Sequence, residues 1–321
     1  MSRPPKRFQL KATRLIPVRP SIPRPYVPCN PSILLTADGY LVNCRGVDIR
    51  RRRSRRRGGE DEVVIRSRNV LMRFSRELEL LDQHPMVIDE PPLRDTSIRG
   101  LEDCRLFEVD GAIYFLCATA DRHPSGHIHL SVCQLERDGR VSAHRPLVGV
   151  FDDRPQKNWL PFVGADGGVR AIYGYAPLTV LRLDLQSGLY EMDVQVRHRR
   201  RAKTWRGSAG PVSIPDSDRR LMLVHDVIIR NRPGGRSERT YLHRFIECDA
   251  AFSLTRVSRP FVFVEEGIEF ACGMTLSHNG ANLVIGVGIQ DERAYLCQVP
   301  LAEVERMLGS PKGLEPFDGQ P

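Results

Sequence analysis

The 321-residue chain lacks the segments that mark a membrane-spanning or exported protein. No apolar run approaches the roughly 20 residues that a transmembrane helix requires. The basic N-terminus, Met1–Arg7, has no apolar segment of the signal-peptide type behind it. We therefore expect a cytoplasmic protein with no membrane span.

The chain also lacks the motifs of metal and nucleotide sites. Its eight cysteines include no C-x-x-C pair, and several lie in or beside apolar strand-like runs, namely Cys104, Cys117, Cys133, Cys272 and Cys297. Such cysteines are typical of a reduced core rather than of a disulfide framework or a zinc site. No Gly-rich phosphate loop precedes a helix. We expect no metal and no bound cofactor.

Acidic residues are fewer than basic ones, and the net charge of +9 is unevenly placed. Arg50–Arg57 contains seven arginines interrupted by Ser54, and Arg197–Arg201 forms a second basic cluster. Such runs can bind nucleic acid, acidic lipid or anionic glycan. Neither has the interleaved aromatic residues of an RNA-binding motif, and like charges repel one another. A solvated loop is favoured, and nucleic acid is the least favoured partner.

Helical periodicity is scarce. A C-terminal helix is expected over Leu301–Leu308, and a weaker pattern suggests another near Arg73–Leu81. The remaining irregular segments are a basic, proline-rich arm (1–25) on the surface or disordered, an arginine-rich insertion loop (50–62), a hairpin or loop (230–239) and a tail (311–321). A single domain over 26–310 remains.

Five apolar runs share one layout, in which a turn precedes the strand and a polar residue closes it. They are Tyr40–Arg45, Ala112–Thr119, Val169–Tyr175, Leu221–His225 and Leu283–Asp291. Each interval has room for about four short strands, which is one propeller blade. The pattern predicts an all-β, five-bladed propeller with a short C-terminal helix. A β-sandwich pair is the alternative, but only a propeller gathers the closing polar residues around one axis.

The segment Gly100–Phe107 places two adjacent acids and an arginine at the start of a strand-like run. Because side chains alternate along an extended strand, Glu102 and Asp103 should point in different directions. One of them can face a pocket while the other pairs with an arginine. A shielded carboxyl group suits proton transfer to a leaving oxygen. The alternative is a surface ion pair.

The order of several motifs resembles the five-bladed propellers of glycoside hydrolase family 130, the β-mannoside phosphorylases and their relatives. The resemblance covers residues 30 to 300. Its landmarks are Asn30-Pro-Ser with Arg45, Gly100–Arg105, Gln156–Phe162, Arg206–Pro211, Leu223–His225, Ile268–Gly273 and Gly288–Asp291. Cys104, Asp226 and the order Pro161-Phe162 depart from the family pattern, so a non-catalytic glycan-binding propeller stays open.

The resemblance implies an inverting enzyme that acts on β-mannosides or related glycosides, with Asp103 as proton donor. Phosphorolysis would use inorganic phosphate as co-substrate and needs cations, for which the candidates are Arg45, Lys157, Arg206, His225 and Arg244. Hydrolysis would need a second carboxylate, from Glu269 or Asp291. The expected substrate-binding residues are Asn30, Glu102, Arg105, Asn158, Trp159, Tyr241 and Asp291. A glycosyltransferase that builds a glycan from an activated sugar is the other alternative.

Several of these residues have a structural alternative. Trp159 is either a platform under a sugar ring or part of the core. Glu269 lies between apolar neighbours and must have a partner, because an unpaired buried carboxylate is costly. Tyr241 and His243 should share one strand face and Arg244 should occupy the other, so the three cannot all line one pocket.

Overall fold

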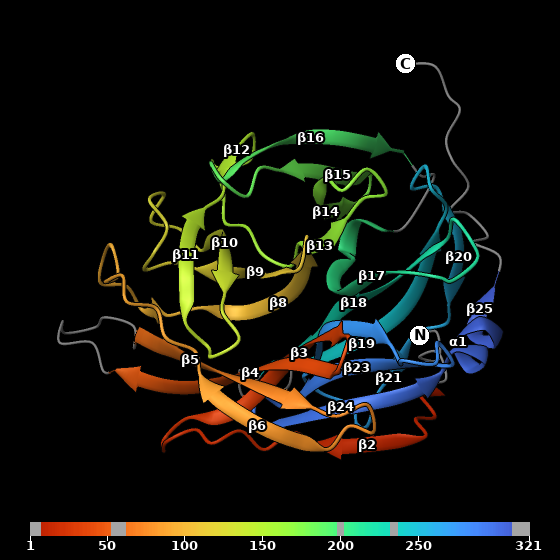
Figure 1. Cartoon of the computed structure of the whole chain (residues 1–321), viewed down its shortest axis with the longest axis horizontal. Helices are drawn as coiled ribbons and strands as arrows, with labels where there is room; N and C mark the ends of the chain where they lie inside the picture. Colours follow the sequence, from red (N-terminus) through yellow and green to blue (C-terminus); the bar gives the residue numbers. More distant parts are fainter. Residues whose placement is uncertain (1–7, 53–61, 198–201, 232–236, 310–321) are drawn as a thin grey trace.

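The computed structural model describes residues 8–52, 62–197, 202–231 and 237–309. The chain forms a five-bladed β-propeller with one short α-helix near its C-terminal end (Figure 1). The predicted fold class is therefore confirmed. The arginines at 53–57, the basic residues 198–201 and the tail lie outside the described residues.

The blades follow one another along the chain. Blade I contains β3 (Val27–Thr36), β4 (Gly39–Arg52), β5 (Glu62–Phe74), β6 (Leu80–Pro85) and the short β7 (Ile98–Arg99). Blade II contains β8 (Glu102–Val109), β9 (Ala112–Thr119), β10 (His129–Leu135) and β11 (Val141–Pro146). Blade III contains β13 (Leu160–Val163), β14 (Val169–Tyr175), β15 (Leu178–Leu183), β16 (Leu189–Val196) and β12 (Val148–Gly149).

The last two blades include strands from the chain ends. Blade IV contains β17 (Arg206–Ser213), β18 (Arg220–Asn231), β19 (Ser237–Cys248), β20 (Leu254–Ser258), β21 (Phe261–Val262), β1 (Phe8–Gln9) and β25 (Leu308–Gly309). Blade V contains β22 (Glu269–Leu276), β23 (Asn282–Ile289), β24 (Arg293–Pro300) and β2 (Arg14–Pro17). A 3-10 turn (Ala202–Thr204) precedes β17.

The described part of the N-terminal segment lies mostly on the surface and adds a strand to the last blade. Its strand β2 pairs antiparallel with β24, so the first blade and the last are joined by the start of the chain. Leu10 and Val18 are buried, which explains why the segment packs against the ring although it is rich in proline.

The five apolar runs found in the sequence form the second strand of each blade, β4, β9, β14, β18 and β23. Asp-Gly, Gly-Gly and Asn-Gly pairs lie in turns that precede four of these strands, as expected for tight hairpins. The turn signals thus located the hairpin between the first and second strands in most blades.

The hydrophobic core is divided among the interfaces between neighbouring blades. Five apolar clusters lie between blades I and II, II and III, III and IV, IV and V, and V and I. All eight cysteines are buried and free, as the sequence predicted. Packing blade against blade closes the ring and protects most sheet edges.

The two predicted helices had different outcomes. The helix α1 (Leu301–Met307) is present. The expected helix near Arg73–Leu81 is wrong, because β5 ends at Phe74 and β6 begins at Leu80. The Ser75 hydroxyl accepts hydrogen bonds from the backbone N–H groups of Glu77 and Glu79, which stabilises a turn instead. In the part of the chain that the structure describes, no helix is long and apolar enough to cross a bilayer.

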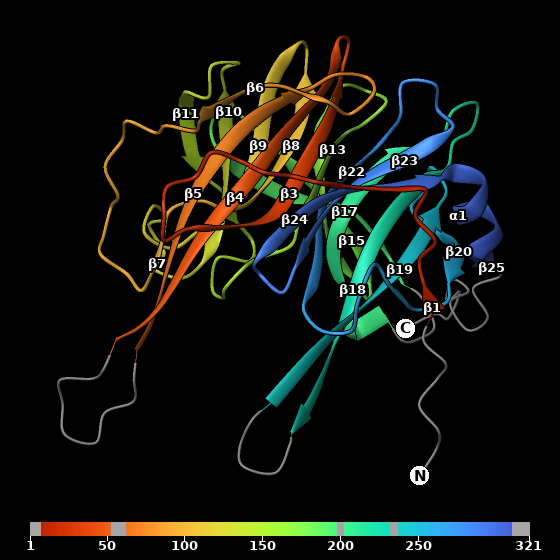
Figure 2. The same ribbon diagram turned by 90° about the horizontal axis from the view of Figure 1, so that it is seen from below.

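The innermost strands β3, β8, β13, β17 and β22 surround the propeller axis. Their first residues meet at one end of the axis and their last residues at the other. Two hairpins, β4–β5 and β18–β19, extend beyond the first of these ends (Figure 2). The polar residues singled out in the sequence lie at this end.

Candidate functional site

The candidate site is built from irregularities at the start of the innermost strands. The pairing register shifts between Cys29 and Ser32 in β3 and between Glu102 and Arg105 in β8. Comparable shifts occur in β17 and β22. Such bulges change the direction of side chains and are frequent next to active sites. Here they turn polar groups of different blades toward one another.

Four residues of the site have a left-handed backbone. Asn30, Asp103, Asn158 and Asp291 have φ values of 45°, 50°, 66° and 53°. Asn and Asp tolerate this conformation better than other non-glycine residues, and such conformations cluster at functional sites. At these four positions, the Asn and Asp residues therefore suit the left-handed backbone and also supply polar groups to the site.

Asp103 is held by two donors from blade I. Its Oδ1 accepts a hydrogen bond of 2.9 Å from Asn30 Nδ2 and one of 3.0 Å from Arg45 Nη1. Arg105, the arginine of the same segment, donates from Nη1 to the Asp103 backbone carbonyl at 3.2 Å rather than to the carboxylate. The Asp103 side chain is 16% exposed, so it is shielded but accessible.

Glu102 lies between two cations. Its Oε1 is 2.5 Å from Arg45 Nη2, and its Oε2 is 2.8 Å from Lys157 Nζ. Arg45 therefore binds both carboxylates of the pair, although strict alternation predicted that only one of them would meet an arginine. The bulge between positions 102 and 105 breaks that alternation. Two of the five expected anion-binding residues, Arg45 and Lys157, are thus already paired with carboxylates.

The charges at the site shift the pKa values of the two nearby aspartates in opposite directions. Burial alone would raise the pKa of the Asp103 carboxyl, but the guanidinium groups of Arg45 and Arg105 lower it below its usual value. Burial raises the pKa of Asp291, and the negative charges of Asp103 and Glu102 raise it further. Asp103 is therefore a carboxylate in the free protein, and Asp291 retains a proton more readily.

Blade IV supplies a wall of aromatic and basic side chains. The rings of His225 and Tyr241 stack with centroids 5.1 Å apart, and Arg206 pairs with His225 across the strands. Burial raises the pKa of Tyr241, and the charge of Asp291 raises it further, which places these groups within electrostatic range. Arg206 is exposed and has no ion-pair partner among the described residues. It is the cation of the site that is available to a ligand.

His225 is a neutral group of this wall. Burial lowers its pKa well below the usual value, and His243 and Arg206 lower it further. Its Nδ1 lies 2.8 Å from the Ser208 hydroxyl. Ser208 was not predicted as a site residue, although it lies in the Arg206–Pro211 motif. His225 can donate one hydrogen bond to a ligand but is not a source of positive charge.

Arg105 crosses the axis beneath these residues. It is 4% exposed, donates from Nε to the Ser208 carbonyl at 3.4 Å and lies 5.6 Å from the Phe270 ring centre. Both contacts come from blades opposite its own. Arg105 therefore forms the floor of the site rather than a part of its open wall.

Three expected site residues do not face the site with a free functional group. Trp159 is 0% exposed and packs edge-on against Tyr190, which supports its alternative role in the core. Arg244 lies on the opposite strand face from Tyr241 and His243, as predicted, where it contacts Asp226 at 3.6 Å. That face points away from His225, so Arg244 does not join the other cations.

Glu269 is the third of them. Its carboxylate accepts hydrogen bonds from the backbone N–H groups of Phe263, Val264 and Glu265, at 2.6, 2.8 and 2.8 Å. The expected partner of this buried carboxylate is therefore the preceding loop. Because both oxygens are engaged, Glu269 fixes that loop and has no free oxygen to activate a water molecule.

Buried histidines behind the wall predict a loss of stability in acid. Burial lowers the pKa of His243 to about 3. Between this value and the usual value near 6.5, the unfolded chain binds a proton that the folded chain does not, so stability falls as the pH falls. We expect His243→Phe, which suits the neighbouring Phe261 and Phe263 rings, to remove about 1.4 kcal/mol per pH unit from that slope. Urea unfolding from pH 7 to 5 measures it, and equal slopes would contradict it.

Within the described ranges, no group of three or more His, Cys, Asp or Glu side chains is arranged to hold a metal ion. The site thus consists of Asn30, Arg45, Glu102, Asp103, Arg105, Lys157, Asn158, Arg206, Ser208, His225, Tyr241 and Asp291. It combines two aspartates of different proton affinity with one available guanidinium group. Such a set can bind a polyhydroxylated ligand, transfer a proton and hold an anion.

No protein-family model and no curated protein sequence matches the chain. Solved structures with a similar fold include β-1,2-mannobiose phosphorylase from Listeria innocua, at 12% identity over 91% of this chain and 96% of that one, with a TM-score of 0.62. A GDP-Man-dependent mannosyltransferase from Leishmania mexicana has 10% identity over 90% of each chain and a TM-score of 0.58. A GH43_1 enzyme from Xanthomonas citri, complexed with xylotriose, has 11% identity over 95% and 97% and a TM-score of 0.55. These likenesses establish the fold.

Proposed function

We propose that this protein is a carbohydrate-active enzyme that transfers a glycosyl group with inversion between phosphate and a glycan hydroxyl, on β-mannosides or related glycosides. The observation that carries this proposal is the convergence of Asp103, Asp291 and the exposed Arg206 at one end of the propeller axis. A phosphorylase and a mannosyltransferase with this fold make the chemistry a natural use of such a site.

Each group has a definite role in this reaction. Asp103 exchanges the proton with the bridging oxygen, directly or through a sugar hydroxyl. Arg206 binds the phosphate, because its guanidinium group can present two parallel N–H donors to an oxyanion. His225 and Tyr241 add neutral donors beside it. Asn158 and Glu102, the latter braced by Arg45 and Lys157, orient the sugar.

The ionised carboxylate of Asp103 is the form that the synthetic direction uses at neutral pH. A carboxylate accepts the proton of an acceptor hydroxyl, while the sugar phosphate loses its phosphate from the opposite face of the ring. Breakdown of the glycan instead needs a proton on Asp103 or on the phosphate that enters. Because the pKa of Asp103 lies below its usual value, the protonated fraction of Asp103 already falls as the pH rises through the acidic and neutral range, and breakdown should slow with it.

Hydrolysis is the second candidate, and Asp291 is the observation that favours it. Its carboxyl lies near Asp103 and within the electrostatic range of Tyr241. An inverting hydrolase needs a second carboxylate to activate water. Glu269 is less suited because backbone donors engage both of its oxygens.

The dependence on phosphate separates the two candidates. We expect release of mannose 1-phosphate from β-linked manno-oligosaccharides only when inorganic phosphate is present, and the reverse synthesis from mannose 1-phosphate but not from mannose. Mass spectrometry of the products measures both. Turnover in phosphate-free buffer that releases free mannose would support hydrolysis instead. Saccharide binding without any product would reject both reactions.

A further inference from the structure

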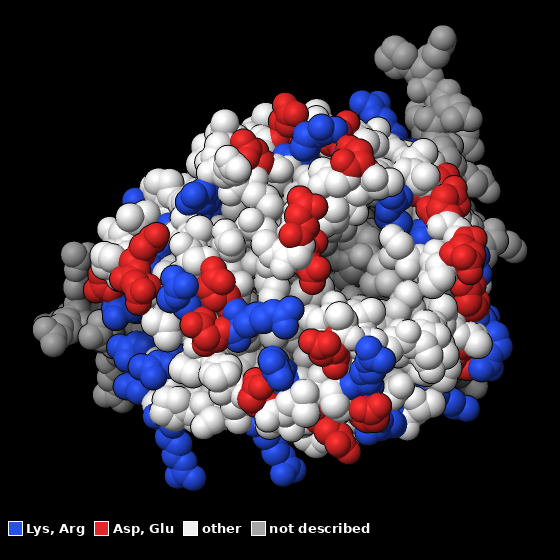
Figure 3. Space-filling model, viewed as in Figure 1, with Lys and Arg blue, Asp and Glu red and all other residues white. Residues whose placement is uncertain are grey.

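The innermost strands end around a cavity. It lies at the opposite end of the axis from the candidate site. The cavity has a volume of about 270 Å³ and is lined by the later residues of β3, β8, β13, β17 and β22. The molecular surface is hollowed near its centre on this face (Figure 3). Pockets for drug-sized ligands begin at about 300 Å³, so this cavity suits a small ion better than an oligosaccharide.

Two arginines of the cavity lining have unused hydrogen-bond donors. Arg105 Nη2 and Arg220 Nη1 are buried and have no hydrogen-bond partner among the residues that the structure describes. Buried N–H groups in folded proteins are almost always paired, because an unpaired donor loses its hydration without compensation. One nitrogen of each guanidinium group thus lacks a hydrogen-bond acceptor, and a ligand in the cavity could supply it.

The surroundings hold both guanidinium groups in place and leave the cavity positively charged. Arg105 is fixed by backbone carbonyls, and Arg220 lies over the Phe252 and Phe162 rings, at 5.0 and 5.9 Å from their centres. Glu108 is the acidic residue of the lining, and it is exposed. Its charge is therefore better screened by solvent than those of the two arginines.

We propose that this cavity is a binding site for a small oxyanion, a phosphate group, held by Arg105 and Arg220. Guanidinium groups match the geometry of phosphate oxygens, and two of them at one cavity favour a dianion. Because the unpaired nitrogens are shielded from solvent, a bound oxyanion would supply the acceptors that water does not. The cavity lies at the opposite end of the axis from the candidate active site, with Arg105 between the two, and this proposal does not depend on the proposed function.

Titration calorimetry with inorganic phosphate tests this site in the full chain. Arg206→Gln removes the available cation of the candidate active site, so phosphate binding that persists in this variant reports on the cavity. In that background we expect Arg220→Gln to weaken binding by about tenfold or more, as for the loss of a charged hydrogen bond. We expect Glu108→Gln to strengthen phosphate binding, because the substitution removes a negative charge from the cavity lining.

Changes of opposite sign in two variants cannot both come from misfolding. The matched control is Arg145→Gln, which removes an exposed positive charge elsewhere and should leave the affinity unchanged. Mannose 1-phosphate in place of phosphate identifies the source, since tighter binding would favour a sugar phosphate. The proposal is overturned if Arg206→Gln abolishes all phosphate binding, or if Arg220→Gln and Glu108→Gln keep the affinity of their background.

Discussion

Asp103→Asn is expected to lower turnover of a glycoside substrate by about a hundredfold to ten-thousandfold, the range for loss of a general acid or base. The substitution removes the proton-transfer group but keeps an oxygen that can accept from Asn30 and Arg45. The left-handed backbone at this position also suits asparagine. The fold should therefore remain intact, and steady-state kinetics in both reaction directions would measure the loss.

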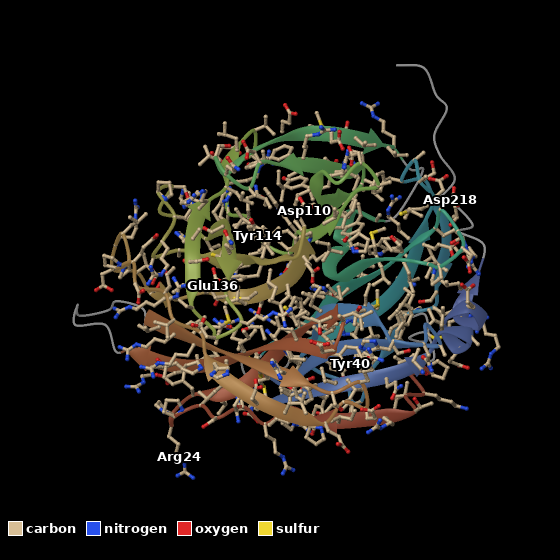
Figure 4. The ribbon with its side chains drawn as sticks, viewed as in Figure 1. Arg24, Tyr40, Asp110, Tyr114, Glu136 and Asp218 are labelled. Carbon is tan, nitrogen blue, oxygen red and sulfur yellow. The ribbon has the colours of Figure 1, made fainter. Side chains whose placement is uncertain are left out.

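The matched control is Asp110→Asn. Asp110 has the same φ of 50° and is exposed, but it lies in the turn between β8 and β9 at the other end of the strand (Figure 4). Its replacement should leave turnover unchanged. If the Asp103 variant retained activity within a few-fold of the original protein, Asp103 would not be the proton-transfer group.

Arg45→Met is expected to destabilise the protein by about 3–5 kcal/mol, the usual cost of removing one partner from a buried ion pair. Arg45 neutralises Glu102 and Asp103 at once, and it also donates from Nε to the Ser67 hydroxyl at 2.9 Å. Without it, Lys157 and Arg105 would have to offset two shielded carboxylates. The free energy of unfolding in urea would reveal the loss.

Two further variants make this test specific. Arg145→Met removes an exposed arginine and should change the free energy of unfolding by less than about 0.5 kcal/mol. Adding Glu102→Gln to Arg45→Met should recover part of the lost stability, because an uncompensated charge disappears. A loss below about 1 kcal/mol for Arg45→Met alone would mean that solvent or other donors replace the guanidinium group.

The repeating part of the fold was predictable because its signals are local. An Asp-Gly turn and the alternating side chains of the strand that follows lie within a few residues of each other, as at Gly39 and Gly111. The strand β2 was not predictable, because its partner β24 lies at the other end of the sequence. The pattern at Arg73–Leu81 misled because a hydroxyl-stabilised turn with two flanking strands can mimic helical spacing.

The residue types of the site were predictable, but their pairing was not. Glu102 and Asp103 were identified from one motif, yet a bulge of one strand decides that both meet Arg45. Burial places Trp159 in the core. Backbone N–H groups of the preceding loop bind the carboxylate of Glu269. These outcomes depend on neighbouring blades, which no single segment of the sequence describes.

The pairing of Arg14 with Gln298 also constrains the order of events during synthesis. During synthesis β2 emerges before blades I to IV, and its partner β24 emerges after them. The strand β2 must therefore stay unpaired while these four blades emerge. Closing so long a loop carries an entropic cost that only the finished ring recovers. Until translation reaches the last blade, the growing chain has an open seam where another chain could pair.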